Sequence, residues 1–179
     1  IVDDELREKM GAAAIKGAKS VNYEGAGTIE FLVDKDKNFY FMEMNTRIQV
    51  EQPVTELTTG IDIVEEQLYV SSGEVLRFEQ KDLKQNGHAI ECRIYAEDPA
   101  NNFLPSPGTL SLYQKPCGDF IRVDDAMHSP YQVSSFFDPM IAKLITNGKT
   151  REEARFHMID ALQNYGIHGI KNNISYLHA

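Results

Sequence analysis

The stretch of sequence that decides the fold is TIEFLVDKDKNFYFMEMNTRIQVE, residues 28–51. It contains two runs rich in β-branched and aromatic residues, 28–33 and 39–44, and a polar loop at 34–38 lies between them. Runs of this composition around a short polar loop are typical of a β-hairpin. We therefore expect a hairpin here, and the remaining elements are placed relative to it.

Two acidic residues occupy facing positions of this hairpin. If Leu32 pairs with Phe41, then Glu30 lies opposite Glu43, and Asn45 follows on the same face. Like charges directly across a strand pair are destabilising, so this arrangement needs a cation. Carboxylate and amide oxygens suit Mg²⁺ or Mn²⁺. A metal that accompanies a nucleotide explains the pattern, and a solvated face with two acids explains it equally well.

Polar residues continue after the second strand. If residues 45–52 stay extended, Arg47, Gln49 and Glu51 lie on the face that carries Asn45. An Arg side chain can hold a planar oxyanion through two hydrogen bonds, and a nearby carboxylate can remove a proton from it. Arg47 and Glu51 would thus suit bicarbonate. By geometry alone, an ordinary surface ion pair between them is the better explanation.

The rest of the first part of the chain is predicted to be helical. Apolar residues recur at helical spacing over 3–19, after an acidic first turn. A capping box at 62–65 predicts a second helix that ends near Gly73, and Pro53 marks a break before it. The polar, aperiodic stretch 78–87 indicates a domain boundary near residue 80.

Beyond this boundary the pattern predicts a small antiparallel sheet. Short strands are expected at residues 88–95, 109–113, 120–123 and 140–146. A capping box at Thr150 and Glu153 begins a final helix, which stops at Gly166 and should cover one face of the sheet. The fold class that we expect is α+β.

Composition excludes several classes of partner. The chain has 27 acidic and 18 basic residues, a net charge of -9, and no basic block of the kind that binds nucleic acid. No apolar run approaches the roughly 20 residues that span a membrane. Cys92 and Cys117 form no paired motif, which favours a reducing compartment, the cytoplasm or a mitochondrial matrix. The start at Ile1 lacks an initiator Met and a signal-peptide pattern, so we expect a piece of a longer protein.

Several strings of the sequence resemble the biotin carboxylase family. They are GTIEF at 27–31, EMNTRIQVE at 43–51, PVTE at 53–56, ECRIYAEDP at 91–99 and FLPSPG at 103–108. These strings follow one another over nearly the whole chain. Other ATP-grasp ligases share acidic metal ligands on paired strands but lack the RIQVE run.

The resemblance implies a fold and an activity. Residues 1–79 would be the C-terminal part of an ATP-grasp domain with the metal and bicarbonate site, and 80–179 a biotin carboxylase C-terminal domain that completes the biotin pocket. The activity would be carboxylation of biotin with bicarbonate through carboxyphosphate, with ATP, Mg²⁺ or Mn²⁺, and biotin on a carrier. The family's N-terminal domain, Gly-rich lid and ATP-contacting lysines would lie upstream of Ile1, so we expect this chain to be inactive alone.

The resemblance also assigns roles to residues. The metal and ATP positions would be Glu30, Glu43 and Asn45, and the bicarbonate positions Arg47, Gln49, Val50 and Glu51. Glu51 would be the general base, and Arg93 would stabilise the biotin enolate. Asp138 falls near the biotin pocket, although spacing alone favours a turn residue before Pro139. Gln52 departs from the family, which commonly has His at this position.

Partners and alternatives follow from the same likeness. The implied partners are a biotin carboxyl carrier, a second copy of the chain and a carboxyltransferase subunit. Tyr95 favours a propionyl-type acyl-CoA carboxylase. One alternative is another ATP-grasp ligase that activates a carboxylate as an acyl phosphate. The other is a non-catalytic fragment that serves only for docking or dimerisation.

Overall fold

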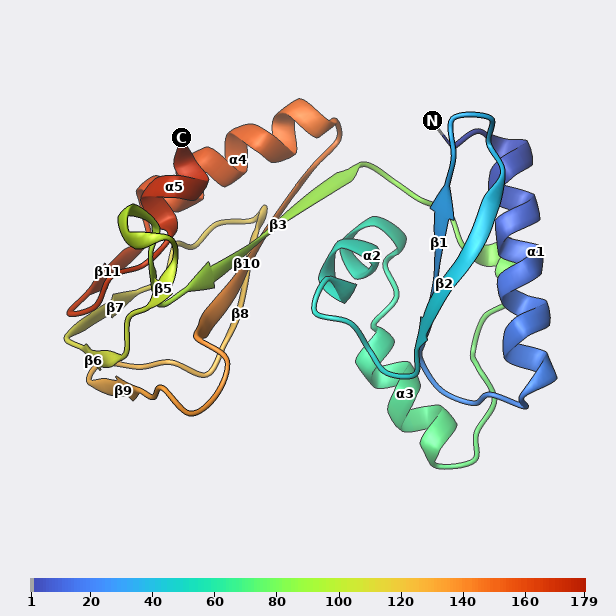
Figure 1. Ribbon diagram of the computed structural model, residues 1–179, viewed down its shortest axis with the longest axis horizontal. Helices are drawn as coiled ribbons and strands as arrows, with labels where there is room; N and C mark the ends of the chain where they lie inside the picture. The colour runs from blue at the N-terminus through green and yellow to red at the C-terminus, as the bar shows by residue number, and fades with distance from the viewer. Residues whose placement is uncertain (1) are drawn as a thin grey trace. The chain divides into compact units, whose positions relative to one another are not determined.

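A computed structural model describes residues 2–179 of the chain as two compact units (Figure 1). The first unit comprises Ile1–Gln52 and Asp62–Leu83, and the second comprises Pro53–Ile61 and Lys84–Ala179. Each unit combines helices with antiparallel strands, which confirms the α+β class. The division at residue 80 into two functional domains stays a prediction, because the units are defined by packing alone.

A helix and a β-hairpin dominate the first unit. Its elements are α1 (Asp4–Ser20), β1 (Thr28–Val33), β2 (Phe39–Asn45), α3 (Ile63–Ser71) and the 3₁₀ helix η1 (Gln80–Asp82). The carboxylate of Asp3 accepts a bond from the backbone N–H of Leu6 at 3.0 Å and so begins α1. Figure 1 shows α1 lying along the hairpin, where a side chain at Gly17 would come within 3.5 Å of Ile29.

The hairpin pairs Glu30 with Glu43, as the sequence predicted. The predicted pairing of Leu32 with Phe41 is wrong, because Leu32 lies opposite Tyr40. The register shifts by one residue immediately after Glu30, so β2 contains one unpaired residue that a strictly alternating ladder does not allow for. The facing acids are therefore retained although the half of the hairpin next to the loop is displaced.

The segment after β2 differs from the extended structure that was expected. Residues 46–51 form a loop with a turn at its end, where the N–H of Gln52 donates to the carbonyl of Gln49 at 3.2 Å. Helix α2 (Gln52–Thr59) follows directly, and Pro53 lies in its first turn, where a missing N–H costs no hydrogen bond. Strand alternation therefore ends at Asn45, and the common face predicted for Arg47, Gln49 and Glu51 stays a prediction.

Helix α3 begins as predicted. The side chain of Asp62 accepts a bond from the N–H of Glu65 at 2.8 Å. The chain beyond α3 returns to it through Arg77, whose Nε donates to Glu66 at 2.8 Å and whose guanidinium lies 4.0 Å from the ring centre of Tyr69. These contacts hold the segment after α3 against the helix.

The second unit is built around one long strand. Its elements are the body of α2, β3 (His88–Tyr95), β4 (Glu97–Asp98), the 3₁₀ helix η2 (Pro99–Asn101), β5 (Leu104–Pro105), β6 (Gly108–Leu110), β7 (Leu112–Gln114), β8 (Ile121–Asp125), β9 (Tyr131–Val133), β10 (Met140–Gly148), α4 (Arg151–Gln163), β11 (Gly166–His168) and α5 (Ile174–His178). Strand β10 lies between β3 and β8, and three further two-stranded pairs, β4–β5, β6–β9 and β7–β11, complete the unit (Figure 1). The single strand predicted for 109–113 is divided, because β6 pairs with β9 and β7 with β11.

Helix α4 covers one face of the β3–β10–β8 sheet, as predicted. Thr150 begins the helix by accepting from the N–H of Glu153 at 3.2 Å. Leu144 of β10, Ile94 of β3 and Ala161 of α4 are completely buried in the shared core. Burial of a side chain the size of Leu contributes roughly 2 kcal/mol.

The other face of this sheet carries a network of charges. Arg122 donates to both carboxylate oxygens of Asp124, at 2.7 and 2.9 Å, and to Glu56 of α2 at 2.7 Å. Lys143 lies 3.4 Å from Asp124. Because the side chain of Glu56 is only 7% exposed, Arg122 supplies a positive charge to a carboxylate that is largely withdrawn from water.

The Arg122→Met substitution should therefore destabilise the second unit by roughly 3 kcal/mol, since it leaves a buried carboxylate without this cation. The double substitution with Glu56→Gln should recover a large part of the loss. Urea denaturation measures both. As a control, Arg155→Met removes an exposed pair with Glu152 and an exposed contact with the Phe156 ring, and it should cost about 1 kcal/mol at most; equal losses for Arg122→Met and Arg155→Met would contradict this interpretation.

A buried tyrosine pair predicts how stability depends on alkaline pH. The hydroxyls of Tyr113 and Tyr165 lie 2.7 Å apart, and Tyr113 donates to Asp125 at 2.8 Å. Burial raises the pKa of Tyr165 from 10.0 to about 12, so folding favours its neutral form. This contribution to stability is complete below the ordinary pKa and is lost as pH rises through that interval.

The Tyr165→Phe variant should lose stability less steeply than wild type across this interval, as urea denaturation at several alkaline pH values would show. Tyr176, which is 59% exposed, supplies the control substitution to Phe. A slope unchanged by Tyr165→Phe would refute the assignment.

Candidate functional site

Two carboxylates and an amide meet on one face of the hairpin. The side-chain Nδ2 of Asn45 donates to Glu30 Oε1 at 2.8 Å and to Glu43 Oε1 at 3.1 Å. Both acids come from paired positions of β1 and β2, and Asn45 is the last residue of β2. The predicted convergence of these three side chains is therefore present, with the amide N–H group bridging two like charges.

The loop after β2 folds back onto this group. Arg47 Nη2 lies 3.4 Å from Asn45 Oδ1, and its Nη1 donates to the carbonyl of Ile48 at 3.1 Å. Gln49 Nε2 donates to Glu30 Oε1 at 3.0 Å. Five of the predicted site residues thus form one hydrogen-bonded network in the first unit, although strand alternation, from which their proximity was predicted, ends at Asn45.

The donor chemistry of this network fits a hard divalent cation. Glu30 and Glu43 supply carboxylate oxygens, and rotation of the Asn45 amide would present its carbonyl oxygen in place of its N–H group. Within residues 2–179, no cluster of three or more His, Cys, Asp or Glu side chains is suited to a metal. Two carboxylates and an amide leave several positions of an octahedral ion for water or phosphate oxygens, which is how Mg²⁺ binds beside a nucleotide.

The remaining bicarbonate positions lie at the start of α2. Val50 and Glu51 form the turn that precedes the helix, and Gln52 is the first helical residue. Val50 is half-buried, whereas Glu51 is exposed. An exposed carboxylate can reach a small anion, but its role as a base stays a prediction.

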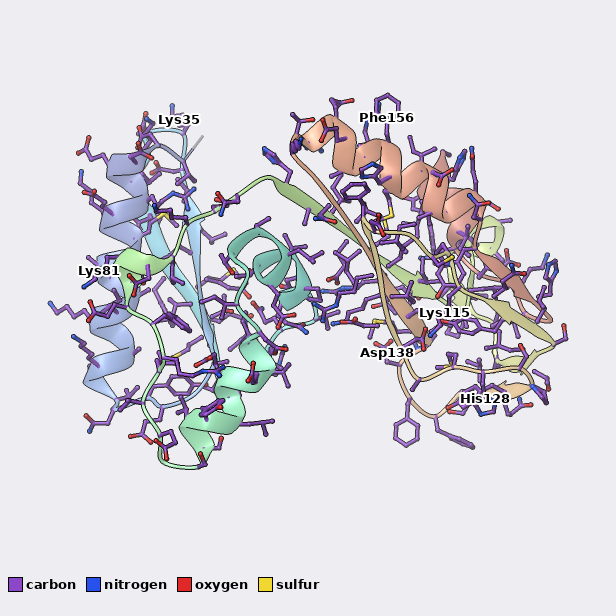
Figure 2. All side chains as sticks on the ribbon, turned by 180° about the vertical axis from the view of Figure 1, so that it is seen from behind. Lys35, Lys81, Lys115, His128, Asp138 and Phe156 are labelled. Atoms are coloured by element: carbon purple, nitrogen blue, oxygen red, sulfur yellow. The ribbon has the colours of Figure 1, made fainter. Side chains whose placement is uncertain are left out.

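The predicted biotin-facing residues belong to the second unit. Arg93 is exposed on β3 opposite Lys143 of β10, and its backbone carbonyl accepts a bond from Asn173 at 3.0 Å. Asp138 lies in the loop that leads into β10 (Figure 2), where it accepts from the N–H of Met140 at 2.8 Å. This bond is typical of a turn residue, which is the role that the sequence spacing favoured for Asp138. The assignment of Asp138 to a biotin pocket stays a prediction.

A groove of about 630 Å³ elsewhere in the second unit contains none of the predicted site residues. Phe120 and His157 line it, and their rings stack 4.5 Å apart. His157 Nδ1 lies 2.7 Å from the carbonyl of Asn147, which gives this histidine a structural role.

Two contacts in the structure were not predicted from the sequence. The bond from Gln49 to Glu30 depends on a loop conformation that no periodicity reveals. The pair between Arg122 and Glu56 joins segments far apart in the chain. The only available signal was the alternation that places Arg122 and Asp124 on one face of a strand.

Comparison with known proteins assigns both parts of the chain. Residues 1–79 match the family described as carbamoyl-phosphate synthase L chain, ATP binding domain, and residues 91–179 match the biotin carboxylase C-terminal domain. Biotin carboxylase 2 of Bacillus subtilis is 53% identical over 98% of this chain. The mitochondrial propionyl-CoA carboxylase alpha chain of Homo sapiens is 52% identical over 98% of the chain.

Solved structures agree with this similarity. The biotin carboxylase domain of 2-oxoglutarate carboxylase from Hydrogenobacter thermophilus, a dimer with MgADP, ADP and bicarbonate, has a TM-score of 0.94 and 47% identity over 99% of this chain. The chain spans 39% of that domain, 39% of the Bacillus protein and 24% of the human one.

None of the helices within residues 2–179 combines the length and the apolar character that a membrane span requires.

The facing carboxylates predict opposite effects on stability and on metal binding. Glu43→Gln removes one of two like charges and should stabilise the metal-free chain by about 0.5 kcal/mol. The same substitution should abolish the added stability that MgCl₂ gives to wild type. Urea denaturation with and without MgCl₂ measures both effects, and Glu24→Gln, an exposed glutamate of the same unit, serves as the control. If Glu43→Gln and Glu24→Gln behave alike, the facing carboxylates are not a metal site.

Proposed function

Since the chain belongs to the biotin carboxylase family, we propose that it supplies the metal, bicarbonate and biotin-facing residues of an enzyme that carboxylates biotin with bicarbonate and ATP. The observation that carries this proposal is the network that joins Glu30, Glu43 and Asn45 to Arg47 and Gln49. Because the chain spans 39% of the Bacillus relative, the activity is proposed for the whole protein rather than for these residues alone.

The nucleotide end of the site would be formed by the hairpin. The Hydrogenobacter relative was solved with MgADP and bicarbonate, which supports ATP, Mg²⁺ or Mn²⁺, and bicarbonate as ligands here. Glu30, Glu43 and Asn45 would hold the cation, which would neutralise charge on the transferring phosphoryl group. In the free chain, the Asn45 amide offsets part of the charge of the two carboxylates.

The bicarbonate end would be formed by the loop after β2. The hydrogen bonds of Arg47 to Ile48 and Asn45 leave further N–H groups of its guanidinium for a planar anion. Glu51 would accept the proton from the bicarbonate O–H group, and the resulting oxyanion would attack the γ-phosphoryl group of ATP to give carboxyphosphate and ADP. Gln49 and Val50 would complete the contacts to the anion.

The biotin end would be formed by the second unit. Carboxyphosphate would break down to CO₂ and phosphate, the phosphate would take the ureido proton of biotin, and the deprotonated nitrogen would capture the CO₂. Arg93, exposed on β3, would hold the negative oxygen of that enolate. Asp138, in the loop before β10, would border the same pocket.

Relatives also indicate the wider assembly. Chains 52% identical include a pyruvate carboxylase subunit of Methanothermobacter thermautotrophicus and the human propionyl-CoA carboxylase alpha chain. The half-reaction that they share, the carboxylation of biotin, is therefore better supported than any one acceptor. We propose a biotin carboxyl carrier and a carboxyltransferase as partners, with Tyr95 favouring an acyl-CoA acceptor. A homodimer is supported by the dimeric Hydrogenobacter relative. A mitochondrial location is supported by the mitochondrial propionyl-CoA carboxylase relative, and a cytoplasmic location is the alternative.

The proposal is tested by separating the two half-reactions in the complete protein. Arg47→Ala should reduce bicarbonate-dependent ATP hydrolysis and biotin carboxylation together, because it removes the group that holds bicarbonate. Arg93→Ala should leave ATP hydrolysis largely intact while carboxybiotin formation falls by roughly 10² to 10³, the scale for losing one donor to a developing anion.

Parallel kinetics and a melting curve for each variant complete this test. If Arg93 has only a structural role, Arg93→Ala should reduce both activities equally and lower the melting temperature. That outcome would remove Arg93 from the mechanism. Failure of the complete wild-type protein to hydrolyse ATP in response to bicarbonate would overturn the proposal as a whole.

A further inference from the structure

One oxygen of Glu30 is shared by two amide side chains. Glu30 Oε1 accepts from Asn45 Nδ2 at 2.8 Å and from Gln49 Nε2 at 3.0 Å. Asn45 ends the strand that pairs with β1, whereas Gln49 lies in the loop beyond it. Two donors on one oxygen fix the orientation of the carboxylate and direct its second oxygen elsewhere.

Among the residues that the structure describes, neither Glu30 nor Glu43 forms an ion pair with a basic side chain. Their charges are offset instead by amide N–H groups, and a hydrogen bond to a charged group is stronger than one between neutral groups. Asn45 supplies one such bond to each acid, and Gln49 supplies the second bond to Glu30. Gln49 is therefore part of what holds the acidic pair together before a cation binds.

Gln49 also connects two parts of the site. It belongs to the loop to which the proposed function assigns bicarbonate, yet its Nε2 contacts a carboxylate assigned to the metal. A primary amide has two N–H groups and a carbonyl oxygen, so the bond to Glu30 leaves one N–H and the oxygen for another ligand. Arg47 reaches the metal side only through Asn45, over 3.4 Å. Gln49 is thus the shorter link between the two ends.

We infer that Gln49 is a positioning residue that couples cation binding to bicarbonate binding. This inference rests on the proposed function. Bicarbonate that engages the free N–H of Gln49 holds its amide in place on Glu30, and a cation that orients Glu30 holds the same amide in place for bicarbonate. Thermodynamic linkage requires that each ligand increase the affinity for the other by the same factor.

The test is a titration of the complete protein with MgCl₂, followed by the backbone amide NMR shifts of β1 and β2. Each titration is run in sodium bicarbonate and in sodium chloride of equal ionic strength. Gln49→Met should weaken Mg²⁺ binding by about 10-fold or more, the scale for losing a residue that orients a metal ligand. Wild type should bind Mg²⁺ more tightly in bicarbonate, and Gln49→Met should lose this difference.

Two further variants keep the result interpretable. Gln49→Asn retains an amide one methylene shorter and should behave like Gln49→Met, which covers the case in which Met disturbs the loop. Gln80→Met, at an exposed position of the same unit, should behave like wild type.

The outcomes distinguish the inference from the function on which it rests. If wild type binds Mg²⁺ equally well in both salts, or if both Gln49 variants keep the wild-type affinity and the bicarbonate effect, the coupling is overturned and the metal site remains. If wild type shows no Mg²⁺-dependent shifts in β1 and β2, the metal site fails and the coupling fails with it.

Discussion

The facing pair of Glu30 and Glu43 is the constraint on which the site depends. Two like charges at paired positions oppose the hairpin that carries them, so the chain must compensate for them nearby. It does so with the amides of Asn45 and Gln49, which donate three hydrogen bonds to the two acids. The need to hold this acidic pair thereby organises the end of β2 and the loop that follows it.

The second unit places charged side chains on one face of a sheet whose other face is buried. Strand β10 gives one face to the apolar core under α4, so the alternate residues of the sheet display charge. Arg122 ties α2 to this charged face through Glu56. Arg93 is exposed on a strand whose other face is buried, so its backbone would be held in place for the proposed contact with biotin.

Local signals in the sequence predicted much of this arrangement. Contacts between residues far apart in the chain could not be predicted in this way. The helix caps at Asp62 and Thr150 could be predicted because a capping side chain bonds to a backbone N–H only three residues further along the chain. The facing acids were predicted from an assumed register that fails for Leu32 and Phe41, and their pairing holds because the register shifts only after Glu30. The bulge after Glu30 was not predicted, because one extra residue in a strand does not visibly change the alternation of apolar and polar residues. Helix α2 was hidden because Pro53 indicates a break as readily as a first helical turn.

The central claim, that the acids of β1 and β2 form the cation site, is tested most directly by paramagnetic broadening. Substoichiometric MnCl₂ is added to the isotope-labelled chain, and the backbone amide resonances are compared by position. We expect the resonances near Glu30 and Glu43 to broaden first, and those near Gln49 with them. Broadening centred instead on the polar loop between the strands, at Asp34 and Asp36 on either side of Lys35 (Figure 2), would contradict this expectation.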